Sequence, residues 1–288
     1  MELLANNPIV PIVLACTLSA VALSLAAFVT KSDFVASAAA PAVFLIGYYA
    51  TYQKVPPFPP VGSTNKIFYI ALFATLGGFV LDRIAVGPLP RAAASLVVSL
   101  LAAVWIAFAQ LDSPDADLIV TGGAVILVGA LVLWRVCMIA AAAKPEGGGA
   151  VALALLAALA AVFAPVALFG GSSTSVGLCL GFAIGLGICS LGLMLAPRSL
   201  GTMAVLGAGG GLLAVIDTVV LITQEADLIA LALVALSPLL GPFGVRLLPG
   251  NLRGSSALVW VATGIAALSP LPVIVTLLFL RHENPLAH

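Results

Sequence analysis

The chain consists of long apolar stretches separated by short polar segments. The apolar stretches are close to 20 residues or longer, the length at which an α-helix crosses the ~30 Å hydrocarbon core of a bilayer. The polar segments are rich in Gly, Pro, Ser and Asp, which end helices and form turns. This pattern predicts ten membrane-spanning helices, at Ile9–Val29, Phe34–Tyr52, Ile67–Val86, Ala92–Leu111, Leu118–Ala143, Ala150–Phe169, Ser175–Ala196, Gly201–Thr223, Leu228–Leu248 and Ala257–Leu280.

Composition agrees with this interpretation. Of the 288 residues, 62% are hydrophobic and only 8% are charged, whereas about 25% of the residues in soluble domains are charged. We therefore expect an all-α polytopic integral membrane protein, with residues 1–288 forming a single transmembrane domain with short loops and no soluble domain. Basic and acidic residues balance to a net charge of zero, so no basic excess favours nucleic acid as a partner.

The eighth predicted span, Gly201–Thr223, combines a glycine cluster with one carboxylate, Asp217. Small residues spaced three or four apart form a smooth helix face, which lets another helix come close. The seventh and eighth spans are joined only by PRSLG, so we expect an antiparallel hairpin in which their glycine faces pack together. The glycines on these faces are Gly177, Gly181 and Gly185 in the seventh span and Gly207 and Gly211 in the eighth.

Charges inside spans are energetically costly, and each one marks a candidate functional site. By helix rise, Arg135 lies roughly 26 Å and Asp82 roughly 22 Å from the outer end of their spans. At these similar depths the two side chains could form an ion pair, or Arg83 and Arg135 could extend to the headgroups. Asp217 lies roughly 9 Å from the outer end, where no cation is evident. It is either a structural carboxyl group or a coupling group that exchanges a proton or binds a cation.

Prolines mark two further features. Pro238 and Pro242 lie inside the ninth span, where each removes a backbone hydrogen bond, so we expect this helix to be kinked or locally unwound. The loop at 53–66 contains four prolines and should follow a stiff, extended path. This loop is either a rigid connector or a docking site for a protein partner.

A faint internal similarity links the third and eighth spans. They read LGGFVLDRI and GGGLLAVIDTV, each with glycines preceding an aspartate. If the chain consists of two five-span halves, an odd number of spans per half would give a weak 5+5 inverted repeat, as in many secondary transporters.

Charges in the loops indicate the orientation. If the spans alternate in direction, seven basic residues fall on one side and three on the other. The side richer in Lys and Arg is cytoplasmic, so we expect external N- and C-termini in a bacterial plasma (inner) membrane. The seven are Lys31, Arg83, Arg91, Lys144, Arg198, Arg246 and Arg253, and the three are Lys54, Lys66 and Arg281.

Few residues could support catalysis. Both histidines, His282 and His288, lie in the C-terminal tail, and all four cysteines fall in apolar runs. We find no zinc-protease, serine-nucleophile or paired-aspartate motif, so we expect no enzyme activity, cofactor or metal. The DSPDAD turn at 112–117 could hold calcium but is better explained as a solvated helix cap.

The sequence therefore favours a small-solute or ion secondary transporter whose site lies near the glycine hairpin and the broken ninth span. The alternative is a non-catalytic integral subunit or assembly factor of a larger membrane complex. With either function we expect the lipid bilayer as a partner, and a protein could bind at the external Pro-rich loop, residues 53–66.

Overall fold

The computed structural model describes residues 7–84, 87–111, 116–142, 148–223, 226–249 and 255–283, and this part of the chain contains helices and no strand. Ten of its helical segments are long and apolar enough to cross a membrane, which confirms an all-α polytopic architecture. The helices are α2 (Ile9–Thr30), α3 (Asp33–Tyr52), α4 (Ser63–Ile84), α5 (Pro88–Ile106), α6 (Ala116–Ala142), α7 (Gly148–Phe169), α8 (Ser173–Leu195), α9 (Thr202–Asp217), α10 (Leu228–Leu247), α11 (Ser256–Leu268) and α12 (Pro270–Glu283).

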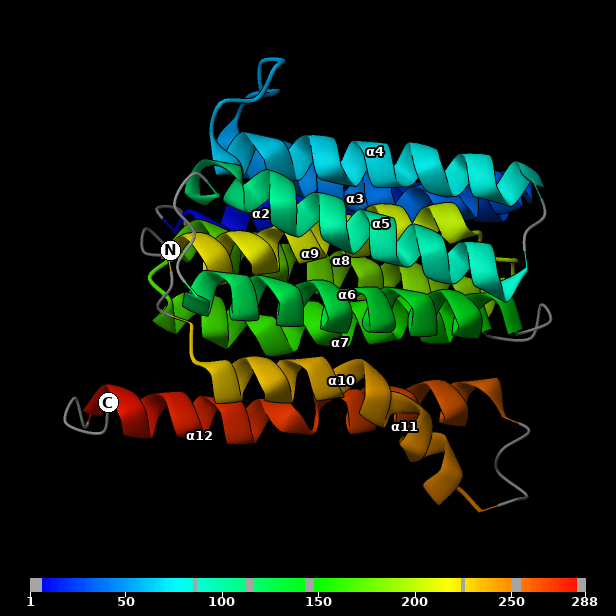
Figure 1. The fold of residues 1–288 in the computed structure, drawn as a ribbon. Coiled ribbons are helices and arrows are strands. Elements are labelled where there is room, and N and C mark those ends of the chain that lie inside the picture. Colours follow the sequence, from blue (N-terminus) through cyan, green and yellow to red (C-terminus); the bar gives the residue numbers. More distant parts are fainter. Residues whose placement is uncertain are drawn as a thin grey trace.

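Three spans depart from a single α-helix. The fourth ends in a 3₁₀ turn, η1 (Ala107–Gln110), and the eighth continues beyond α9 as a π-helix, η2 (Thr218–Thr223). The last span is divided at Ser269, because the proline that follows cannot donate a backbone hydrogen bond and its ring crowds the preceding turn. By contrast, α10 is one helix that contains both Pro238 and Pro242, and Figure 1 shows it bending in its second half.

Helix α9 lies in the middle of the bundle, where it packs against α3, α4, α5, α6 and α7 (Figure 1). In its most apolar stretch 89% of the residues are buried by protein, against 28% for α4. The pair formed by α10 and α11–α12 lies along one side, mainly against α7. The start of α2 and the end of α12 are at the same end of the bundle, as an even number of crossings requires.

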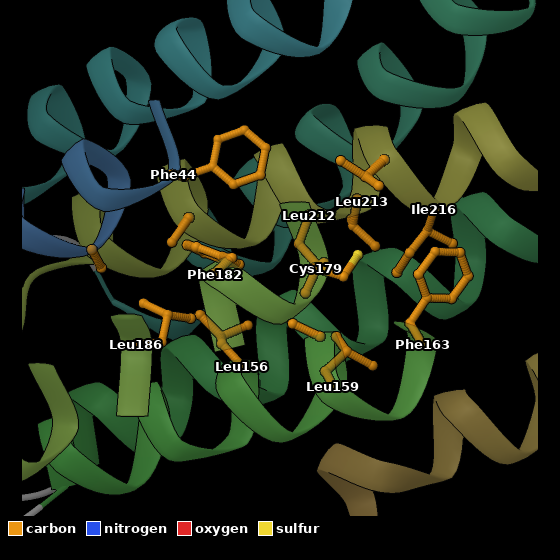
Figure 2. Close-up of a cluster of buried hydrophobic side chains, with 14 of the residues drawn as sticks. Phe44, Leu156, Leu159, Phe163, Cys179, Phe182, Leu186, Leu212, Leu213 and Ile216 are labelled. Carbon is orange, nitrogen blue, oxygen red and sulfur yellow. The ribbon is translucent and has the colours of Figure 1, made fainter. Parts of the chain in front are cut away.

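The core is formed where α3, α7, α8 and α9 meet (Figure 2). Phe44 of α3 contacts Phe182 of α8 edge to face, with ring centroids 5.1 Å apart, a favoured geometry for aromatic rings. Leucines and a phenylalanine of α7 face Leu212 and Ile216 of α9 across the same cluster. The outer helices carry many exposed apolar side chains, which suit contact with lipid.

A serine links three helices inside this core. Ser190 of α8 is fully buried, and its hydroxyl donates a hydrogen bond to the carbonyl oxygen of Ala150 in α7 at 2.5 Å. The same hydroxyl accepts one from the indole nitrogen of Trp260 in α11 at 2.6 Å. An indole N–H that is partly buried without an acceptor would be costly, so this contact helps to hold α11 against the bundle.

The predicted glycine hairpin between α8 and α9 is wrong, because the two helices do not pack along their lengths. The glycines of α8 face α2: a Cβ atom at Gly181 would lie 3.1 Å from the sulfur atom of Cys16. The two predicted glycines of α9, Gly207 and Gly211, face α3 and α4, and a Cβ atom at Gly211 would lie 2.6 Å from the Phe44 ring. A small-residue face fits any helix that offers matching bulk, and the short connection does not decide which helix this is. The remaining glycines behave alike: Gly177 and Gly185 face α2 and α3, and Gly207 faces α3 and α4.

The inverted repeat is not apparent in the packing. Helices α4 and α9, which correspond in the two halves, do contact each other closely. Their surroundings differ, however, since α9 is enclosed by five helices while most of α4 faces outward. Asp82 is exposed at the end of α4, whereas Asp217 is buried in the centre of the protein. The two aspartates therefore do not occupy equivalent positions.

Candidate functional site

Asp217 is the last residue of α9 and is only 1% exposed. Its Oδ1 atom has no hydrogen-bond partner among the residues that the structure describes. Gly210, seven residues earlier and so on nearly the same helix face, lies against Ala74 of α4 and Val98 of α5. The carboxyl group is therefore on the side of the central helix that faces α4 and α5.

The helix changes type directly after this carboxyl group. The backbone N–H of Thr218 is shared between the carbonyl oxygens of Ala214 and Val215, and a π-helix follows. The Thr218 hydroxyl also donates to the Ala214 carbonyl at 2.7 Å. π-Helices are rare in proteins, so Asp217 is an unpartnered buried carboxyl group that also lies at an unusual change of backbone geometry.

A buried lysine at the same end of the bundle was not assigned a role from the sequence. Gly78 packs against Met203, and Gly210 against Ala74, so α4 and α9 run antiparallel and the start of α4 lies at the Asp217 end. Lys66, in the first turn of α4, is 7% exposed, and its Nζ atom donates to the carbonyl oxygen of Trp105 at 2.7 Å. The structure shows no ion pair between Lys66 and Asp217, both of which it describes.

A cleft reaches α9 beside Asp217. This α6–α10 cleft has a volume of about 320 Å³ and is walled by α6, α7, α9 and α10, with Leu213 and Ile216 contributed by α9. It adjoins a second cavity of about 780 Å³, and both are lined by Val120, Thr121 and Leu228. The second cavity is more polar, and Asp117 lies on its wall. The central helix is thus approached from the Asp217 end by a cavity that is polar at its mouth and apolar at its inner end.

Asp82 caps the opposite end of the central helix. Its Oδ1 atom accepts a hydrogen bond from the backbone N–H of Thr202 at 2.6 Å, and its Oδ2 atom accepts one from Met203 at 3.0 Å. Ser37 of α3 accepts a third, from Gly201, at 2.8 Å. A carboxylate at this position satisfies orphan donors and complements the positive end of the helix dipole.

Of the two alternatives for Asp82 and Arg135, the structure does not show the ion pair. Both residues are described, no ion pair joins them, and Arg135 is exposed on α6. Asp82 instead lines a cavity of about 380 Å³ together with Arg83, Arg91 and Asp33. The idea that these two residues pair rested on their similar depth in the bilayer. Similar depth along two spans does not place two side chains on facing helix surfaces.

The prolines of α10 lie among close helix contacts. A Cβ atom at Gly241 would be 2.3 Å from a Leu155 methyl group of α7, and one at Gly244 would be 2.2 Å from the Ala262 carbonyl oxygen of α11. Pro238 is buried and Pro242 is partly buried within this segment. The second half of α10 is therefore a packed, bent helix, while the cleft lies along its first half.

An ion pair with no signal in the sequence joins the start of the ninth span to the end of the tenth. Asp227 accepts hydrogen bonds from the backbone N–H groups of Ile229 and Ala230, at 2.8 and 3.0 Å, and so caps α10. The same carboxylate pairs with Arg281 near the end of α12. The two residues are 54 positions apart, so the sequence gives no signal for the ion pair. The cap alone has a sequence signal, which is an acidic residue directly before an apolar run.

The Pro-rich loop is partly attached to the bundle. The hydroxyl of Tyr69 in α4 donates to the Pro56 carbonyl at 2.8 Å, and its ring lies against that of Phe58. Phe58 is nevertheless 70% exposed and Val61 is 88% exposed. Figure 1 shows the loop extending past α4, so part of it offers apolar groups beyond the helices.

Comparison of the chain with protein-family models, curated proteins and solved structures found no match. The conclusion about its class therefore rests on its own sequence and structure. Ten apolar spans enclose a largely buried central helix, and this chain is a multi-pass, membrane-embedded protein in contact with lipid.

Proposed function

We propose that this protein is a secondary transporter of a small solute or ion in a bacterial plasma membrane, without enzymatic chemistry, in which Asp217 is the coupling group. The observation that carries the proposal is a buried carboxyl group with an unpartnered oxygen, at an α-to-π transition in the central helix. Such a group can carry a proton or ligate a cation.

The energetic cost of Asp217 favours a functional role. Buried polar atoms in proteins are almost always hydrogen-bonded, and an exception needs an explanation. An aspartate that served only packing would be replaced by an apolar residue with little loss or with a gain in stability. A carboxyl group that must exchange a proton or a cation has to keep a free oxygen, which accounts for the missing partner.

Cavities at both ends of the central helix also support transport. The cavity beside Asp82 lies at the Thr202 end of α9, and the more polar cavity of about 780 Å³ that Asp117 lines lies at the Asp217 end. A transporter that alternates between two open states needs a polar approach from each side. The described structure has closely packed residues between these cavities, as Gly210 with Ala74 and Val98 illustrates.

The test is proton flux into proteoliposomes that contain a trapped pH-sensitive dye, driven by a potassium diffusion potential. Wild-type protein should move protons faster than empty liposomes, and Asp217→Asn should lose this flux while keeping the thermal melt. Arg135→Gln is the control for the loss of a charge, because this arginine is exposed on α6 and lines none of the three cavities described above, and it should leave the flux unchanged.

Two outcomes would decide against the proposal. Unchanged flux in Asp217→Asn would remove this carboxyl group from the mechanism. No flux in the wild type, together with a collapsed melt in the variant, would favour a non-catalytic subunit in which Asp217 is structural. The exposed apolar groups of the Pro-rich loop, Phe58 and Val61, would then be the first candidates for contact with the rest of the complex.

A further inference from the structure

The α6–α10 cleft is apolar at its inner end. Its walls there include Val128, Val132, Leu159 and Leu231, and its volume of about 320 Å³ is within the range of ligand sites. The residues that line it belong to membrane-spanning helices, so water is not its natural content. An apolar cleft of this size between lipid-facing helices calls for an apolar occupant.

The length of the cleft corresponds to one leaflet of a bilayer. It follows α6 from Val120 to Val132, a distance of roughly 18 Å at 1.5 Å per residue. One leaflet of a bilayer has a hydrocarbon thickness of about 15 Å, half of the whole core. A single hydrocarbon chain that enters from the Asp217 end would therefore fill the cleft along its length.

The mouth is polar and carries negative charge. Among the described residues that line the adjoining cavity, the charged residue is Asp117, which is in no ion pair with another described residue. Asp227, beside the same cavity, is already paired with Arg281. No basic residue is among the described residues that line this cavity. The charge at this mouth complements a cationic group rather than an anionic one.

The geometry points to a binding site for one chain of a membrane lipid whose headgroup carries an amine. The chain lies in the apolar cleft between α6 and α10, and the amine faces Asp117 at the mouth. The inner end of the chain reaches Leu213 and Ile216, which flank Asp217 on α9. This inference concerns binding alone and holds whether or not the protein moves protons.

The test is native mass spectrometry of the detergent-purified protein after addition of phosphatidylethanolamine or phosphatidylglycerol with identical chains. Wild-type protein should retain one phosphatidylethanolamine with an affinity about two- to five-fold higher than for phosphatidylglycerol, the size of effect that one exposed ion pair supports. Asp117→Asn should keep the bound lipid but lose this preference, because only the contact to the amine is removed.

Filling the cleft tests its location. Ala124 on α6 and Ala232 on α10 are exposed residues that line the cleft from opposite sides. Ala124→Phe and Ala232→Phe should each weaken retention at least about tenfold, because the ring takes the volume of the chain. Ala22→Phe, at an exposed position of α2, is the control for added surface area. Thermal melts of all variants verify that each is folded.

Each result has a definite meaning. Equal retention in Ala124→Phe, Ala232→Phe and Ala22→Phe would show that the lipid binds elsewhere on the surface and would overturn the site. A loss in both cleft variants without any preference for the amine headgroup in the wild type would overturn the role of Asp117. Proton flux is not part of either readout, so failure of the lipid site and failure of the transport proposal are separate results.

Discussion

Gly78 of α4 lies directly against Met203 of α9: a Cβ atom at Gly78 would be 2.5 Å from the Met203 Cα atom. The obstacle is backbone, which cannot rotate away as a side chain can. We therefore expect Gly78→Ala to push α4 from the central helix and to destabilise the protein by about 1–3 kcal/mol, the usual cost of overpacking. Detergent unfolding followed by circular dichroism would measure this change.

The neighbouring Gly77 provides the matched control, because a Cβ atom there meets nothing within 4 Å. Alanine is the better helix former by about 1 kcal/mol, so Gly77→Ala should be neutral or stabilising. Equal effects of the two substitutions would mean that α4 and α9 are not in close contact at this point.

Asp82 should stabilise the protein as the cap of α9 and not as the partner of Arg135. Asp82→Ala removes the acceptor for two backbone N–H groups, at Thr202 and Met203, and should cost about 1–2 kcal/mol. Asp82→Asn keeps one acceptor oxygen and should cost less. The exposed Arg135 should be replaceable by Gln with little effect, and the double variant should be additive to within about 0.5 kcal/mol. A recovery of stability in the double variant would restore the ion pair that the sequence suggested.

The spans could be predicted from the sequence because helix formation in a bilayer depends on local properties. Each crossing must satisfy its own backbone hydrogen bonds over about 20 apolar residues, and all ten predicted spans correspond to helical segments. Lys66 shows the limit of this method: hydropathy places the residue in a loop, whereas the first turn of α4 contains it and buries it. A lysine can enter the protein where a carbonyl oxygen, here that of Trp105, accepts its hydrogen bond.

Partners between helices could not be predicted in the same way. Asp82 reaches the N-terminus of α9 across 120 residues, and Asp227 reaches Arg281 across 54. Such contacts depend on which helices are neighbours, and a single sequence does not contain that information. Asp217 could be identified because the energetic cost of a carboxyl group in an apolar span can be recognised from the sequence of that span alone, whatever surrounds it. The missing partner of its Oδ1 atom and the π-helix that follows required the structure.

Asp227 and Arg281 should contribute unequally to the stability of the last two spans. Arg281→Gln removes only the ion pair, in which the arginine side chain is 35% exposed, and should cost less than about 1 kcal/mol, with a loss that shrinks in high salt. Asp227→Ala also removes the cap of α10 and should cost about 1 kcal/mol more. Detergent unfolding followed by circular dichroism would measure both costs. Equal costs for the two variants would mean that the cap contributes nothing.

The orientation expected from the basic residues can be tested with single cysteines at the two ends of the bundle. Lys144 and Arg253, two of the residues that set the expectation, lie outside the described residues, so we choose Gly62 and Pro197, which are both exposed. The native cysteines need not be removed: their exposed fractions are 0%, 1%, 1% and 3% for Cys16, Cys137, Cys179 and Cys189, and a thiol must meet water to react. If both termini are external, an impermeant maleimide should label Gly62→Cys in intact spheroplasts and Pro197→Cys only after the membrane is opened. The wild type should stay unlabelled in both conditions. Labelling of Pro197→Cys alone from outside would reverse the orientation, and the Asp217 end of the bundle, with its cleft, would then face the cytoplasm.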